Sequence, residues 1–326
     1  MVIKLRILIT GGAGYIGSHI VRLLKDKHGI TVYDCLINGH RESIPDDVKF
    51  VEGCLSDTKL LDEVFSKGNF DAVIHLAGFI EAGESMIEPE KYFRNNTVNG
   101  FNLLKAMRKH DVKRLVFAST AAVYGEPESL PITEEAGKKP TNYYGLSKLM
   151  FEQMLDTFEV YGFRSICLRF FNASGAGFGI GEHHNPETHL IPLVLQVALG
   201  KRESIKIFGT DYPTKDGTCI RDYVHVLDIA KAHELALEAL EKGKSGKFNL
   251  GTNKRHSVKE VIETCREVTK HPIPAAEEAR REGDPAVLVA SFDKAFSELG
   301  WRPEKELKEI ISSAWEWHSK NPEGFS

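Results

Sequence analysis

The sequence predicts an α/β fold: a doubly wound parallel sheet followed by a smaller mixed α/β domain. Short β-rich apolar runs alternate with helical stretches through the first half of the chain, and such alternation places helices on both faces of a parallel sheet. A glycine-rich turn joins the first of these strands to the first helix. The 326 residues, 42% of them apolar, suffice for a large core divided between about two domains.

The elements of the first domain, residues 1–171, follow from the apolar pattern and the length of each run. Strands are predicted at residues 5–10, 30–33, 48–51, 72–76, 115–119 and 165–171, and helices at 16–27, 92–110 and 144–161. Residues 172–326 are predicted to cover the substrate, and we expect some of their segments to return to the first domain. This second region contains a Gly-, His-, Asn- and Pro-rich loop at 173–186, helices at 190–199, 226–240 and 306–318, and a turn at 211–217.

The composition argues against several kinds of partner. The chain carries 42 basic and 46 acidic residues, a formal net charge of -4, which does not indicate a nucleic acid or an anionic membrane surface. No apolar run is long enough for a transmembrane helix, and the N-terminal run is interrupted by Lys4 and Arg6, so it is interpreted as a strand rather than a signal peptide. The five cysteines form no Cys-x-x-Cys pair, which is typical of reduced thiols in the cytoplasm.

The glycine-rich turn predicts a dinucleotide site. Gly11, Gly14 and Gly17 follow a G-x-x-G-x-x-G spacing between a predicted strand and a predicted helix. Residues without a Cβ permit a tight turn and close approach of a pyrophosphate, and the helix N-terminus offers free N–H groups to it. Tight turns of other kinds also use glycine, so the glycine spacing alone does not indicate nucleotide binding. Its position between a strand and a helix does. In that setting it indicates a Rossmann-type nucleotide-binding domain.

An acidic residue follows at the end of the second predicted strand. Asp34 lies about 20 residues beyond the glycines, where a carboxylate can accept hydrogen bonds from the adenosine ribose and repel a 2′-phosphate. The next residue is Cys35 rather than an arginine. The pattern therefore favours NAD over NADP, although a strand-end cap would use the same residue.

Proton-transfer chemistry is indicated by Tyr144 and Lys148, which lie one turn apart on a predicted helix. An ammonium beside a phenol favours the phenolate, so we expect Lys148 to lower the pKa of Tyr144 and make it a general acid/base. Ser119 and Thr120 end a strand 24 residues earlier and could hydrogen-bond the same substrate oxygen. Alone, a Tyr-x-x-x-Lys pair is more often a solvated surface pair, and only its combination with the glycine loop gives it weight.

Glycine loop, strand-end Ser/Thr and Tyr-x-x-x-Lys together resemble the extended short-chain dehydrogenase/reductase family. Further motifs are similar to those of the UDP-glucose 4-epimerases within that family, from residue 5 to about residue 318: His75-Leu-Ala-Gly78, Val123-Tyr-Gly125, Leu168-Arg-Phe-Phe-Asn172, Phe208-Gly209, Tyr212-Pro-Thr214, Asp216-Gly-Thr218, Arg221-Asp-Tyr-Val-His225 and Arg281-Glu-Gly-Asp284.

The resemblance implies a reaction and a site. Tyr144 would take the proton of the sugar's 4-hydroxyl while hydride passes from C4 to bound NAD⁺, and the 4-keto sugar would turn and receive the hydride on its other face. Lys148 would hold the nicotinamide ribose and Thr120 would share the proton. The resemblance assigns cofactor binding to Gly11, Gly14, Tyr15, Ile16, Gly17, Asp34, Cys35, Asn38, Gly39, Cys54, Leu55, Leu76, Ala77, Gly78, Ile80, Asn95, Ser119, Tyr144, Lys148 and Phe171. It assigns substrate binding to Thr120, Tyr144, Asn172, His189, Leu190, Phe208, Arg221, Arg281 and Asp284.

In three places the chain departs from what the family commonly carries. Cys54 stands where an aspartate meets the adenine, Ile80 where a lysine lies near the nicotinamide ribose, and His189 where an asparagine is frequent. We expect NAD binding to persist with altered affinity. Leu288 stands where the family walls the sugar pocket; being shorter than an aromatic residue, it predicts some turnover of UDP-N-acetylglucosamine. Helices 92–110 and 144–161 resemble those that form a dimer interface, so a homodimer is expected.

Three other functions remain open at this point. A 4,6-dehydratase needs an acid and a base after the threonine, and Ala121 and Ala122 cannot move protons. A UDP-glucuronate epimerase or decarboxylase would use the same oxidised intermediate. A non-enzymatic NAD sensor predicts a broken Tyr/Lys pair, and this pair is intact. No metal is expected: His183, His184 and His189 are interpreted as part of a polar loop over the active site, because no carboxylate or cysteine is spaced to complete a ligand set.

Overall fold

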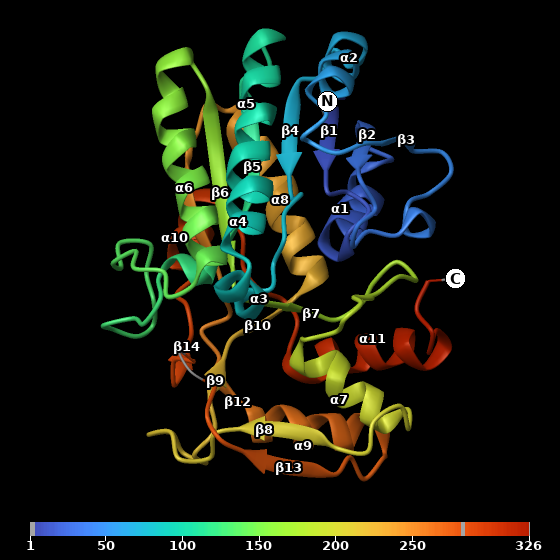
Figure 1. The fold of residues 1–326 in the computed structure, drawn as a ribbon, viewed down its shortest axis with the longest axis vertical. Coiled ribbons are helices and arrows are strands. Elements are labelled where there is room, and N and C mark those ends of the chain that lie inside the picture. Colours follow the sequence, from blue (N-terminus) through green and yellow to red (C-terminus); the bar gives the residue numbers. More distant parts are fainter. Residues whose placement is uncertain (1–3, 282–283, 326) are drawn as a thin grey trace.

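The computed structural model describes residues 4–281 and 284–325, and its centre is a seven-stranded parallel sheet (Figure 1). The strand order is β11-β6-β5-β4-β1-β2-β3. The strands are β1 (Arg6–Thr10), β2 (Gly29–Asp34), β3 (Lys49–Glu52), β4 (Ala72–His75), β5 (Arg114–Thr120), β6 (Arg164–Phe170) and β11 (Gly246–Leu250). The predicted doubly wound parallel sheet is confirmed.

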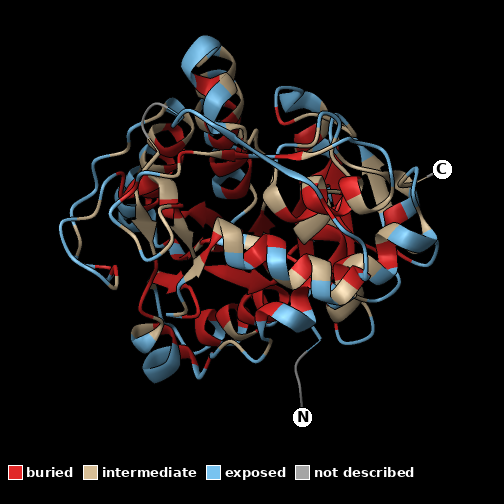
Figure 2. Cartoon of the chain, turned by 90° about the horizontal axis from the view of Figure 1, so that it is seen from below, coloured by how far each residue is buried: buried red, intermediate tan, exposed pale blue. Residues whose placement is uncertain are grey.

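Two layers of helices cover the sheet because alternate strand residues face opposite sides. Ile7 and Ile9 of β1 belong to one core and Leu8 to the other. The first core is closed by α1 (Tyr15–Leu24), α8 (Val226–Glu241) and α10 (Asp293–Leu299). The second is closed by α2 (Thr58–Gly68), α5 (Asn99–Lys109) and α6 (Tyr143–Phe158). In Figure 2 the buried residues gather on the sheet and on the inner faces of these helices.

The remaining elements form a smaller body beyond the carboxyl ends of the strands, in the lower half of Figure 1. Its helices are α7 (Leu190–Ala198), α9 (Val258–Thr269) and α11 (Leu307–Lys320), which share one core. Its strands form three small sheets: β7 (Asn172–Ser174) with β10 (Tyr223–His225), β8 (Ile205–Phe208) with β13 (Ala275–Glu278), and β9 (Ile220–Arg221) between β12 (His256–Ser257) and β14 (Val287–Leu288).

Several element predictions need adjustment. The single helix predicted at 92–110 is α4 (Pro89–Tyr92), a π-helical turn at Phe93–Val98 and then α5; such turns occur often at functional sites. The sequence reasoning passed over α2 and α3 (Ala82–Ile87). The start of the predicted loop at 173–186 pairs as β7 with β10. Segments after residue 172 return to the first sheet, since β11 pairs with β6; the domain boundary at 171/172 itself stays a prediction. None of the helices in the described residues is long and apolar enough to cross a membrane.

Candidate active site

A large cleft opens where β1, β2, β4 and β5 end, the edge at which parallel α/β sheets bind ligands. Its empty space is about 1120 Å³. The predicted cofactor residues converge on it, and those that line it are Gly11, Gly14, Tyr15, Ile16, Gly17, Asp34, Cys35, Asn38, Gly39, Cys54, Leu55, Leu76, Ala77, Gly78, Ile80, Asn95, Ser119, Tyr144 and Lys148. Phe171 does not: it packs into a cluster with Ala121 and Tyr124, while its neighbour Phe170 lines the cleft.

The glycine turn packs too closely against nearby backbone of the same chain to allow larger residues. Gly11 has φ of +72°, and a Cβ there would lie 2.4 Å from the Ala77 nitrogen. A Cβ on Gly17 would lie 2.3 Å from the Gly11 oxygen. Gly14 is the N-cap of α1 and supplies no side-chain cap, so the first amides of that helix and its positive dipole end face the cleft. The turn is therefore a cradle for an anionic group.

Asp34 ends β2 beside this cradle and is held by the backbone. One carboxylate oxygen accepts from the Ala13 amide and the other from the Leu36 amide, each at 2.9 Å. Burial raises the pKa of Asp34, and these amides work against that shift. Each oxygen keeps a further lone pair for a ligand hydroxyl. At the end of β3, the carbonyl of Cys54 accepts from the Tyr33 hydroxyl at 2.9 Å.

The two hydroxyls at the end of β5 have different partners because strand neighbours face opposite sides. Ser119 donates to Glu152 at 2.6 Å, inside a buried network with Arg169. Thr120 is free of that network, and its oxygen accepts from the Ala122 amide at 3.1 Å. Its own proton therefore remains available to donate. Of the two hydroxyls, Ser119 lines the cleft but gives its proton to Glu152, whereas Thr120 keeps its proton.

Tyr144 is brought to Thr120 by a close contact between α6 and the turn after β5. A Cβ on Gly145 would lie 2.5 Å from the Ala122 carbonyl oxygen, so only glycine allows this approach. Asn142 caps the helix by accepting from the Gly145 amide at 2.8 Å. Burial raises the pKa of Tyr144 to about 12, and a hydrogen bond with Thr120 offsets part of that shift.

Lys148 does not act on Tyr144 as the sequence suggested. It is 4% exposed, donates to the Ala118 carbonyl at 3.1 Å, and lies 5.0 Å from the centre of the Phe117 ring. Burial lowers the pKa of Lys148 to about 8. The expectation that this ammonium lowers the pKa of Tyr144 is wrong for the protein alone, because burial without a counter-charge favours the neutral form of both groups.

Four of the predicted substrate residues in the second body form two pairs of contacting side chains. Arg221 in β9 donates to the Pro285 carbonyl at 2.8 Å and to Asp284 at 3.2 Å. Arg281 lies over the ring of Phe208, 3.9 Å from its centroid. Both contacts are typical of guanidinium groups, which pair with carboxylates and stack on aromatic rings. Glu282 and Gly283, between these residues in the motif, lie outside the described residues.

Leu288 links this region to the catalytic turn. It pairs with Arg221 across β14 and β9, and it packs, half-buried, on the cluster that contains Ala121, the residue after Thr120. Asn172 begins β7 and is exposed, and Leu190 begins α7. The sugar-pocket position predicted for Leu288 is thus close in the fold to both sets of residues.

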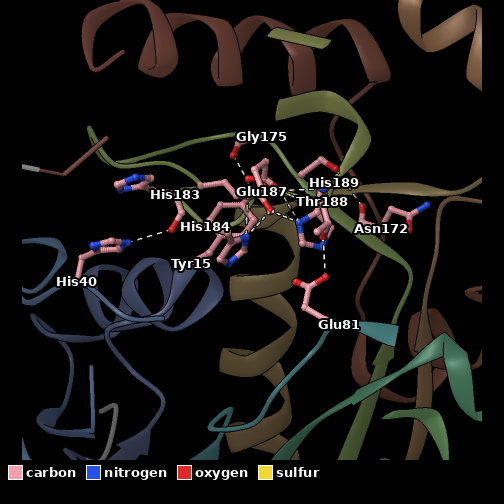
Figure 3. A network of polar contacts seen from close by, with 12 residues as sticks. Tyr15, His40, Glu81, Asn172, Gly175, His183, His184, Glu187, Thr188 and His189 are labelled. Carbon is pink, nitrogen blue, oxygen red and sulfur yellow. Dashed lines mark hydrogen bonds and ion pairs between the residues drawn. The ribbon is translucent and has the colours of Figure 1, made fainter. Parts of the chain in front are cut away.

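His189 belongs to a different arrangement from the one predicted. Its Nδ1 is 3.0 Å from a carboxylate oxygen of Glu182 and 3.0 Å from one of Glu187, and His184 joins the same group (Figure 3). Burial opposes charge on Glu182 and His189, yet their mutual attraction raises the pKa of His189 and lowers that of Glu182 to about 2. The prediction that no carboxylate is spaced to complete a ligand set with these histidines is therefore wrong. His183 stays apart, stacked on His40.

Sequence reasoning missed seven residues of the cleft wall: Tyr33, Ile37, Gly53, Phe79, Ala118, Phe170 and His184. Most of them directly precede or follow a predicted site residue, so the predicted strand ends could have identified them. His184 was not among the predicted site residues, although the loop that carries it was predicted to lie over the active site.

The chain matches the model of the NAD dependent epimerase/dehydratase family over residues 7–251. It belongs to that family. It is 53% identical to a UDP-glucose 4-epimerase of Halalkalibacterium halodurans, over 98% of this chain and 97% of that protein. A crystal structure of a UDP-glucose 4-epimerase superimposes with a TM-score of 0.95 at 49% identity, covering 98% and 99% of the two chains. The Bifidobacterium longum UDP-glucose 4-epimerase, solved in complex with NAD⁺ and UDP, gives 0.93 at 39% identity, also covering 98% and 99%.

The family membership explains why the cleft and the second body face each other. In this epimerase/dehydratase the glycine cradle, Thr120, Tyr144 and Lys148 all lie at the carboxyl edge of the sheet, and the arginines come from the segments beyond it. Ala121 and Ala122, which follow Thr120, carry no group that transfers a proton.

Proposed function

We propose that this protein interconverts UDP-glucose and UDP-galactose by epimerisation at C4, through a transient 4-keto sugar and with bound NAD. The observation that carries the proposal is that Tyr144 and Lys148 line the same cleft as a dinucleotide cradle, with Thr120 hydrogen-bonded to Tyr144. The full-length similarity to UDP-glucose 4-epimerases supports the sugar nucleotide as substrate.

The residues of the cleft fit NAD. The turn at Gly11 and Gly17 and the uncapped N-terminus of α1 match a pyrophosphate. Asp34 matches the adenosine ribose hydroxyls and disfavours a 2′-phosphate. Lys148 reaches the wall near Gly78, where a Cβ would be 3.2 Å from its nitrogen, and we assign it to the nicotinamide ribose. When bound, NAD⁺ supplies the hydride acceptor, then the donor, and a positive charge in the cleft.

Tyr144 moves the proton in both half-reactions. In the first, its phenolate accepts the proton of the 4-hydroxyl as C4 is oxidised; in the second, the phenol returns that proton to the oxygen at C4. Thr120 donates to the phenolate oxygen, which its own bond from Ala122 leaves it free to do. Because the pKa of Tyr144 is raised to about 12 in the protein alone, the positive charge of the cofactor is required for the phenolate.

We assign the sugar nucleotide to the second body. Arg221 and Arg281 are placed for its diphosphate, since the planar guanidinium suits phosphate oxygens. Asp284, Phe208, Leu190, Asn172 and His189 are proposed as further substrate contacts. The ion pair between Arg221 and Asp284 at 3.2 Å holds that arginine in place.

The decisive assay uses purified protein without added NAD. UDP-galactose should be converted to UDP-glucose, and Tyr144→Phe should lower kcat by about 10²–10⁴-fold while NAD binding and the far-UV circular dichroism spectrum are unchanged. Unchanged UDP-galactose in the presence of NAD-loaded protein would refute the proposal. Turnover of a UDP-glucuronate instead would point to the alternative epimerase or decarboxylase.

The half-buried Leu288 beside Arg221 supports a wider substrate range. Its side chain is shorter than an aromatic one and leaves room for a 2-acetamido group, so UDP-N-acetylglucosamine should also be turned over. Leu288→Tyr should reduce that turnover and spare UDP-galactose. Absence of activity on the acetylated sugar at high enzyme concentration would contradict this.

We also propose a cytoplasmic homodimer. Exposed apolar side chains lie along α5, α6 and the segments that adjoin them: Val98, Phe101, Met150, Val160 and Tyr161. An exposed apolar surface of this kind marks an interaction site. Light scattering that gives the mass of one chain would argue against the dimer.

A further inference from the structure

Four potential metal ligands meet in the loop between β7 and α7. They are Glu182, His184, Glu187 and His189, a Glu-x-His pair followed by a second Glu-x-His pair. Each contributes one ligand atom, and these atoms all lie within 4.8 Å of one another. Figure 3 shows Glu187, His184 and His189 turned toward one centre.

The spacing of the group is close to that of a small tetrahedral site. His184 Nδ1 is 3.2 Å from a Glu182 oxygen and 3.9 Å from one Glu187 oxygen. His189 Nδ1 is 3.0 Å from a Glu182 oxygen and 3.0 Å from the other Glu187 oxygen. Tetrahedral zinc with bonds of about 2.0–2.1 Å places its ligand atoms about 3.3–3.4 Å apart. Because the four ligand atoms lie only within 4.8 Å of one another, the side chains would draw closer around an ion.

The hydrogen bonding of His184 points the same way. Its Nδ1 is buried and makes no aligned hydrogen bond within the described residues, although a Glu182 oxygen lies 3.2 Å away. In a purely ion-paired cluster this nitrogen would direct its proton at that oxygen. A lone pair directed at a shared centre gives the observed geometry. Glu182 is 4% exposed, so bulk water does not provide an alternative partner.

We propose that Glu182, His184, Glu187 and His189 bind a divalent transition-metal ion such as Zn²⁺. Two neutral imidazoles and two carboxylates exactly balance its charge in a buried place, and imidazole nitrogen with carboxylate oxygen suits zinc and its first-row neighbours. All four tetrahedral positions are filled by side chains, which is typical of a structural rather than a catalytic site.

The ion would fix the loop to both halves of the molecule. His184 lines the cofactor cleft, and His189 is the N-cap residue of α7. Between the two histidines, Thr188 donates to Glu81, the N-cap residue of α3, at 2.7 Å. The metal would therefore hold the loop that connects the cleft wall to the substrate helix. This role does not depend on which sugar the protein transforms.

The test measures metal directly on NAD-loaded protein. After treatment with a chelator and gel filtration, zinc is titrated and counted by mass spectrometry, and cobalt is added as a coloured probe. We expect about one zinc per chain and the intense visible absorption of tetrahedral cobalt. Glu182→Gln should weaken zinc binding by about 10²-fold or more. His183→Gln changes the adjacent histidine outside the cluster and should leave affinity and spectrum unchanged.

Two results would overturn the proposal. One is wild-type protein that binds no stoichiometric zinc and gives only the pale spectrum of hydrated cobalt. The other is an equal loss of zinc in Glu182→Gln and His183→Gln, which would assign the metal to surface histidines. If Glu182→Gln fails to fold, the wild-type stoichiometry and cobalt spectrum still decide the question.

Discussion

Replacement of Lys148 by methionine should make the cofactor-free protein respond differently to pH. Lys148 is 4% exposed, and within the described residues its ammonium has a single hydrogen bond, to the Ala118 carbonyl. Burial lowers its pKa from 10.5 to about 8. The lysine is thus a cost to folding wherever it is charged.

The size and sign of the effect follow from linkage. Because the folded pKa is below the unfolded pKa, the unfolded chain binds the extra proton between pH 8 and 10.5, so the stability of the wild type rises with pH in that window. A difference of about 2.5 pKa units corresponds to about 3 kcal/mol. The methionine variant lacks this term, and its lost hydrogen bond to Ala118 adds only a pH-independent offset.

The assay is urea unfolding of both proteins, freed of NAD, at several pH values from 7 to 10.5. Other titrating groups cancel in the difference between the two free energies of unfolding. As the pH rises over this range, we expect the wild type to gain about 3 kcal/mol of stability relative to the methionine variant, mostly above pH 8. A difference that stays constant would show that Lys148 is not held charged at a cost, and the reasoning would fail.

Three further predictions concern single side chains. Gly145→Ala should lower kcat by about 10²-fold and should also destabilise the fold, because its Cβ would lie 2.5 Å from the Ala122 carbonyl oxygen, so that α6 or the turn must shift; unchanged steady-state kinetics would contradict this. Asp34→Asn should weaken NAD binding about 10-fold in calorimetry and reduce the preference over NADP; an unchanged ratio of the two affinities would contradict it. Glu152→Gln should cost about 3–5 kcal/mol in urea unfolding, because it leaves the Arg169 guanidinium, 1% exposed, without its counter-charge; a loss below about 1 kcal/mol would contradict it.

The fold was largely predictable because its signals are local. The continuous apolar run of β1, which is buried on both faces, and the glycine turn after it are visible in consecutive letters of the sequence. The sheet was predicted from the repetition of such strands between helices. The π-helical turn at Phe93–Val98 was not predictable, since it is fixed by distant contacts: Asn96 bonds the backbone of Phe79 and the hydroxyl of Ser147. The return of β11 to the sheet also depends on pairing across the chain.

Site residues could be predicted where they follow the ends of strands. They could not be predicted where packing in the folded protein determines which side chain faces the cleft and which partner it bonds. Strand direction brought Thr120 to Tyr144, but only the structure shows that the hydroxyl of Ser119 donates to Glu152. Phe170 rather than Phe171 lines the cleft because strand alternation turns the latter into another cluster. The carboxylates beside the loop histidines were present in the sequence and became meaningful only once the loop closed on itself.

The electrostatics of Tyr144 and Lys148 explain how the reaction can be tied to the bound cofactor. In the protein alone, burial raises the pKa of Tyr144 to about 12 and lowers that of Lys148 to about 8. Neither shift favours a phenolate, and the two groups do not correct each other because the ammonium bonds to Ala118. A positive charge entering the same low-dielectric cleft stabilises the phenolate strongly, since few other charges screen it. Under the proposed function, Tyr144 would become a base when a hydride acceptor is beside it, so proton removal and oxidation at C4 would occur together.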